Sequence, residues 1–124
     1  MKNILLLTSL LFFTLTSCTK ENIITGAWKG KNNDGVGLLW TFSPDGKASS
    51  TKGNSPIQEM KYSTDKSKTP WHINLNSLVD DGTLRAIYKF TASGKLVIGI
   101  NQDVTIRPKS FTTPGLQLLI LTKK

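Results

Sequence analysis

Turn-forming residues recur along this chain at intervals of roughly ten residues, and this spacing constrains the fold more than any other feature. Each turn contains a glycine, which tolerates the positive φ angles of tight turns. The turns are Asn32-Asn33-Asp34-Gly35, Ser43-Pro44-Asp45-Gly46, Asp80-Asp81-Gly82 and Ala92-Ser93-Gly94. Segments of this length suit short β-strands, and none of them carries a helical pattern of apolar residues.

Apolar and polar residues alternate between these turns, as they do in strands with one buried face. The alternation is clearest over 71–76, and the segments 84–90 and 96–100 predict a hairpin around the Ala92-Ser93-Gly94 turn. The last segment, 116–121, is apolar on both faces. We expect it to be covered on both sides or to close the sheet against the first strand.

Eight or nine strands are predicted, and an antiparallel sheet of that size tends to curl and close, which removes exposed edges. The sequence therefore predicts a small all-β, antiparallel up-and-down barrel, with a β-sandwich as the alternative. The predicted strands are 25–31, 36–43, 47–52, 57–62, 71–78, 83–90, 95–101, 104–111 and 116–122. The predicted interior consists of Trp40, Phe42, Trp71, Ile73, Tyr88, Phe90, Leu96, Ile98 and Leu118.

Cys18 is the only cysteine of the chain, and it ends a short apolar stretch that follows a basic start. This arrangement is typical of a secretory signal, and the stretch is short for a membrane span. Leu15-Thr16-Ser17-Cys18 resembles the lipobox of bacterial lipoproteins, which implies that Cys18 carries lipid, including acyl chains such as palmitate. The alternatives are cleavage near Ser17 with a free thiol, or an uncleaved anchor.

The lipobox divides the chain into a signal peptide at 1–17, a lipidated cysteine with a short tether at 18–22, and one folded domain at 23–124. The expected location is the bacterial cell envelope, lipid-anchored in the outer membrane. A membrane attached through Cys18 is the first expected partner, and the domain is expected to be monomeric.

The chain is basic, with a formal net charge of +8. This charge favours contact with anionic headgroups or acidic polymers, or it belongs to a solvated lysine-rich surface. Nucleic acid is not an expected partner, because recognition favours arginines interleaved with aromatic residues. After the signal segment the chain has only Arg85 and Arg107.

The residues needed for catalysis are scarce. His72 is the one histidine, and it falls on the polar face of its predicted strand, while Asp34, Asp45, Asp80 and Asp81 lie in turns. A nucleophile needs a base and an orienting group, and a metal site usually needs three or four clustered ligands. We therefore expect a protein that is not an enzyme and that has no cofactor or metal.

Ordered motifs cover nearly the whole domain and resemble a family of small, uncharacterised bacterial lipocalin-like domains. The motifs are Gly26-Ala27-Trp28, Thr41-Phe42-Ser43-Pro44-Asp45-Gly46, the spaced set Tyr62, Asp65, Lys68 and Pro70, Ile87-Tyr88, and Arg107-Pro108-Lys109-Ser110-Phe111. The resemblance implies a barrel. It also implies that Trp28 plugs one end with a basic side chain over its ring, for which Arg107 is the candidate.

Binding is the function class that remains. A small barrel either holds one small ligand or is filled by its own side chains. The first hypothesis is a module for a small hydrophobic or amphipathic ligand, held by the candidate interior residues Trp40, Phe42, Trp71, Tyr88 and Phe90. The alternative is a filled barrel that acts on an envelope protein, as an interaction or inhibitor module, through its loops or a basic face. An open cavity larger than about 300 Å³ would favour the first.

Overall fold

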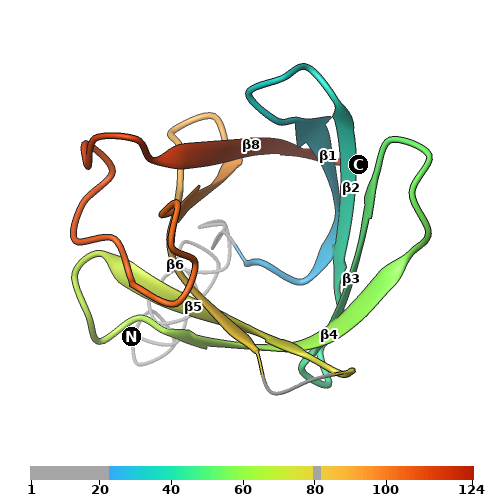
Figure 1. The fold of residues 1–124 in the computed structure, drawn as a ribbon, viewed down its shortest axis with the longest axis horizontal. Coiled ribbons are helices and arrows are strands. Elements are labelled where there is room, and N and C mark those ends of the chain that lie inside the picture. Colours follow the sequence, from blue (N-terminus) through green and yellow to red (C-terminus); the bar gives the residue numbers. More distant parts are fainter. Residues whose placement is uncertain (1–22, 80–81) are drawn as a thin grey trace, which may run out of the picture.

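The computed structural model describes residues 23–79 and 82–124, which form a closed barrel of eight antiparallel strands. Each strand pairs with the next in sequence, and the last pairs with the first (Figure 1). The strands are β1 (Gly26–Lys31), β2 (Gly37–Phe42), β3 (Lys47–Lys52), β4 (Gln58–Asp65), β5 (Trp71–Ser77), β6 (Thr83–Phe90), β7 (Leu96–Ile100) and β8 (Gln117–Lys123). The predicted up-and-down barrel is confirmed, with eight strands.

Two sequence predictions concern residues outside the described part of the chain. They are the lipidated cysteine, Cys18, with its signal and tether, and the first two residues of the Asp80-Asp81-Gly82 turn. Within the described residues, no helix has the length and apolar character needed to cross a bilayer.

The barrel closes where β8 returns to β1. Gly30 lies opposite Leu121 in this pairing, and an added Cβ at Gly30 would collide with the backbone of Ile120. The backbone N–H of Lys124 also donates to the carbonyl of Ala27 at 2.8 Å. All eight strands and their closing pairing lie between Gly26 and Lys123, so the barrel closes within this segment.

Because successive strands run in opposite directions, the connections divide between two ends of the barrel. One end, which we call the closed end, contains the β2–β3, β4–β5 and β6–β7 connections together with the start of β1 and the end of β8. The end with the β1–β2, β3–β4, β5–β6 and β7–β8 connections is the open end.

Aromatic side chains fill the closed half. Trp28 is only 2% exposed and its ring lies 6.1 Å from that of Phe90. Phe90 in turn lies 6.3 Å from Trp71 and 6.1 Å from Tyr88. Such tilted and edge-to-face contacts favour dense aromatic packing. The indole N–H of Trp28 donates to the carbonyl of Ile24 at 2.8 Å, which satisfies its one polar atom.

The predicted strand at 104–111 is wrong. This segment belongs to the turn-rich β7–β8 connection, in which the Asp103 carboxylate accepts hydrogen bonds from the backbone and hydroxyl of Thr105. Its Phe111 reaches the outer face of β7, where it lies close to Gly99. Apolar residues of this connection cover a sheet face and so produced a strand-like pattern without making a strand.

The predicted interior position of Leu118 is also wrong. Leu119 and Leu121 lie in the core instead, and Ile120 is exposed. A segment that is apolar at successive positions does not reveal which face points inward, and a slip of one residue exchanges the two faces. The pairing with β1 fixes the register, so the expectation that this strand closes the sheet is confirmed.

Candidate functional site

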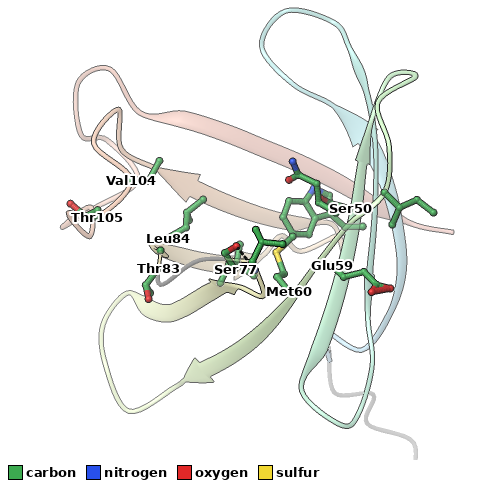
Figure 2. Close-up of a pocket in the computed structure, with 14 residues that line it drawn as sticks. Ser50, Glu59, Met60, Ser77, Thr83, Leu84, Val104 and Thr105 are labelled. Atoms are coloured by element: carbon green, nitrogen blue, oxygen red, sulfur yellow. Dashed lines mark hydrogen bonds between the residues drawn. The ribbon is translucent and has the colours of Figure 1, made fainter.

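A cavity of about 710 Å³ opens at the open end of the barrel. Five strands, β2 to β6, and the connections at this end contribute to its wall (Figure 2). The lining residues are Trp40, Ser50, Ile57, Gln58, Glu59, Met60, Leu75, Ser77, Val79, Gly82, Thr83, Leu84, Val104 and Thr105.

The inner wall is apolar with two small hydroxyl residues. Met60, Ser77 and Leu84 point toward the middle of the cavity in Figure 2. Leu75 is buried two positions before Ser77 on the same strand, so strand alternation places both on the inner face. Small side chains such as those of Ser50 and Ser77 leave this half of the barrel hollow, in contrast to the aromatic closed half.

The floor of the cavity is joined to the packed closed half through Trp40. This indole is 8% exposed and stacks on Phe42 with ring centroids 5.7 Å apart. Phe42 in turn makes an edge contact with Tyr62 at 5.0 Å, and the Tyr62 hydroxyl donates to the carbonyl of Ser43 at 2.8 Å. Trp40 is therefore held in place by neighbours that do not themselves line the cavity.

Charge is directed away from the cavity. Glu59 is the one ionisable residue among the lining residues. It precedes the inward-pointing Met60 on β4, and its carboxylate points away from the cavity in Figure 2. An apolar wall with scattered hydroxyl and amide groups can hold a hydrocarbon chain and an uncharged polar group.

The mouth is surrounded by exposed apolar side chains. Ile57, Val79 and Val104 line the cavity while being more than a third exposed to solvent, and Val79 reaches 92%. Leu78 precedes Val79, and Ile106 lies in the same connection as Val104; both are exposed. Five of the seven exposed large apolar side chains among the described residues thus belong to connections at the open end.

The structure brings only one of the five predicted ligand-binding residues to the cavity. Trp40 lines it, whereas Phe42, Trp71, Tyr88 and Phe90 are packed among one another and their neighbours in the closed half. Sequence reasoning identified an aromatic interior correctly but did not place it along the barrel axis. Leu75 and Leu84 carried a usable signal, because both lie on predicted inward faces near the ends of their strands.

The predicted pairing of Trp28 with Arg107 is wrong, although Trp28 does plug the closed end. The ammonium of Lys123 lies 4.7 Å from the Trp28 ring centroid and donates to the carbonyl of Thr25 at 2.7 Å. Arg107 instead contacts the neighbouring strands β5 and β6. Its guanidinium donates to the carbonyl of Ala86 at 2.7 Å and to the side-chain oxygen of Asn74 at 2.6 Å.

His72 lies on the outer face beside this arginine. Loss of solvation and the positive charges of Arg107 and Lys68 lower its pKa, and Asp65 opposes that shift. Within the described residues there is no group of three or more histidine, cysteine, aspartate or glutamate residues placed to hold a metal ion. Burial raises the pKa of the Tyr88 phenol above its ordinary value of about 10.

Comparison of the chain with protein-family models, with curated proteins and with solved structures found no match. The geometry of the barrel and its cavity therefore carries the functional argument.

Proposed function

We propose that this protein is a non-catalytic, lipid-anchored module of the bacterial cell envelope that binds a small, uncharged amphipathic molecule in the open half of its barrel. The observation that supports this proposal is the cavity of about 710 Å³ behind the apolar mouth. Ligand pockets commonly occupy about 300 to 1,000 Å³ and combine apolar walls with a few polar groups.

The chemistry of the wall argues for an uncharged ligand. A buried carboxylate or ammonium loses its hydration and needs a charged or strongly hydrogen-bonding partner. Glu59 points away from the cavity, and the other lining residues are apolar, glycine, or carry only hydroxyl or amide groups. A ligand with an alkyl part and a hydroxyl or ester group fits this wall better than a fatty acid, despite the basic charge of the whole chain.

A comparison of three amphiphiles of equal chain length tests the ligand class. Dodecanol, dodecanoate and dodecylamine are titrated into the purified barrel at neutral pH, with bound ligand counted by native mass spectrometry. We expect dodecanol to bind at least about tenfold more tightly than dodecanoate, a difference of about 1.4 kcal/mol. Tighter binding of dodecanoate would contradict the uncharged class, and binding of none of them would contradict a pocket for alkyl chains.

The location in the envelope is proposed from the sequence around Cys18. Its test is metabolic labelling with a palmitate analogue in cells that produce the natural chain or Cys18→Ala. We expect label on the natural chain alone. Equal labelling of the two chains would refute the lipid anchor and leave the cavity proposal standing.

A second candidate function is an interaction module for an envelope protein, and the exposed apolar residues around the mouth favour it. Such patches on soluble proteins often mark contact sites. Substitutions at the rim separate the two functions. A variant confined to rim residues that do not line the cavity, Leu78→Ser with Ile106→Ser, makes the distinction: if a protein partner is bound at the rim, it abolishes cross-linking to that partner in cells, while dodecanol still enters the cavity.

A further inference from the structure

The connections at the closed end and the strand residues next to them carry a surplus of positive charge. This end has six lysines and only two aspartates, Asp45 and Asp65. The lysines are Lys47, Lys66, Lys68, Lys95, Lys123 and Lys124. At the open end the described connections and adjoining residues carry a smaller surplus. There Lys31, Lys52 and Lys109 are accompanied by Asp34 and Asp103.

Both aspartates of the closed end are engaged in local turns. The Asp45 carboxylate accepts from the backbone N–H of Lys47 at 3.2 Å. Asp65 accepts from the backbone and the hydroxyl of Ser67 at 2.9 and 2.6 Å. Their oxygens stabilise the turns that present the neighbouring lysines.

Two of the lysines are positioned by aromatic rings. The Lys66 ammonium lies 4.8 Å from the Trp71 ring centroid, and that of Lys123 lies 4.7 Å from the Trp28 ring centroid. These contacts hold positive charge directly over the aromatic plug. Lys68, Lys95 and Lys124 are exposed around them.

The chain also enters the barrel at this end. Ile23, the first described residue, lies three positions before β1, whose first residue is at the closed end. Four residues lie between it and the lipid-bearing position proposed at Cys18. A span this short keeps the closed end near whatever surface holds the anchor.

We propose that the closed end is a docking surface for an anionic phospholipid bilayer, and that this contact turns the mouth of the barrel away from the membrane. The inference rests on the proposed envelope location, but not on the cavity. Headgroup phosphates match the surplus lysines, whereas the described residues of the open end carry less net charge and include exposed apolar side chains. The pocket then faces the aqueous space or a partner, so its ligand arrives from there and not directly from the supporting leaflet.

Vesicle binding by the barrel alone tests this surface without the lipid anchor. Residues 19–124 are mixed with phosphatidylcholine vesicles that do or do not contain phosphatidylglycerol, and bound protein is measured by co-sedimentation at low and high salt. One variant combines Lys68→Gln, Lys95→Gln and Lys124→Gln at the closed end. Its matched control combines Lys31→Gln, Lys52→Gln and Lys109→Gln, which removes the same charge from other exposed positions.

We expect binding to require phosphatidylglycerol, to weaken with salt, and to fall at least about tenfold in the closed-end variant only. Thermal unfolding of both variants shows that each is folded. Equal losses of vesicle binding in the two variants would show that binding depends on net charge alone and not on an oriented surface, which would overturn the proposal. Absence of vesicle binding by the natural barrel would also overturn it.

A fluorescent label reports the orientation directly, because residues 19–124 contain no cysteine. An environment-sensitive dye is attached at Ser93→Cys in the β6–β7 turn or at Asn54→Cys in the β3–β4 turn. Vesicles with phosphatidylglycerol should change the emission at Ser93 and leave that at Asn54 unchanged. The reverse pattern would show that the mouth, and not the closed end, meets the membrane.

Discussion

At the scale of single residues, Trp28 contributes to the aromatic packing of the closed end and also contacts a lysine that adds positive charge there. Its ring is buried, its N–H is satisfied by Ile24, and the ammonium of Lys123 lies over its face. The family resemblance implied a basic side chain over this ring, with Arg107 as the candidate, whereas the structure places Lys123 there. The actual partner comes from the next strand of the closed sheet, a neighbour that only barrel closure reveals.

A double-mutant cycle distinguishes the two basic residues. Trp28→Leu and Lys123→Met should show a coupling of about 0.5 to 1 kcal/mol in the free energy of unfolding, as expected for a cation over an indole ring. Trp28→Leu and Arg107→Met should show a coupling near zero. Urea denaturation of the single and double variants measures both, and a larger coupling for Arg107 would contradict the observed contacts.

His72 provides a pH-dependent readout of the outer face. Its pKa is lowered by loss of solvation and then by Arg107, so NMR titration should place it below the usual value of about 6.5. Because the folded state disfavours the charged imidazole, stability falls as the pH drops through about 6.5 toward the folded pKa. Arg107→Met should raise the His72 pKa. A pKa above the usual value in the natural protein would contradict this environment.

At the scale of the elements, the contact between β1 and β8 closes the barrel and depends on Gly30. Gly30→Ala places a Cβ against the backbone of Ile120 and the side chain of Leu121. We expect it to lower the free energy of unfolding by at least about 2 kcal/mol. Chemical denaturation measures the loss.

Gly37→Ala is the matched control, because nothing lies within 4 Å of a Cβ added there. Its effect should stay within about 0.5 kcal/mol. Equal effects of the two substitutions would show that the β1–β8 approach is not as close as the structure describes.

The sequence predicted the strands in which the alternation of apolar residues and the flanking turns agree. It failed where a connection that covers the sheet has an apolar pattern like that of a strand. β6 and β7 with their glycine turn were found because both signals were present. Phe111 was placed in a strand because the β7–β8 connection is itself apolar where it covers the sheet. Leu118 was predicted to point inward because its segment is apolar on both faces, whereas Leu119 and Leu121 lie in the core.

The candidate site was harder to predict than the fold, because the interior is filled at one end of the barrel axis and open at the other. Trp40 and Phe42 share one face of β2, yet Trp40 lines the cavity and Phe42 packs below it. Alternation determines which residues point inward, but not how neighbouring strands are offset along the axis. Ser50 and Ser77 went unnoticed because small polar residues in a strand give no apolar signal.

At the scale of the whole molecule, the barrel has two different ends. Its aromatic half supplies the buried apolar area that a domain of this size needs for stability. The other half is thereby free to remain open. The lysines surround the packed end, and the exposed apolar residues surround the mouth. We propose that this difference divides one small barrel into a stabilising half and a binding half.

Trp40 gives the most direct test, because it is the tryptophan that lines the cavity while Trp28 and Trp71 lie in the closed half. Dodecanol is titrated into the natural barrel, into Ser77→Phe, which fills the cavity, and into Asn76→Phe on the opposite face of the same strand. We expect an emission change that Trp40→Phe removes, affinity weakened at least about tenfold by Ser77→Phe, and no effect of Asn76→Phe. Equal affinities of Ser77→Phe and Asn76→Phe, or a signal that persists in Trp40→Phe, would contradict binding in the open half.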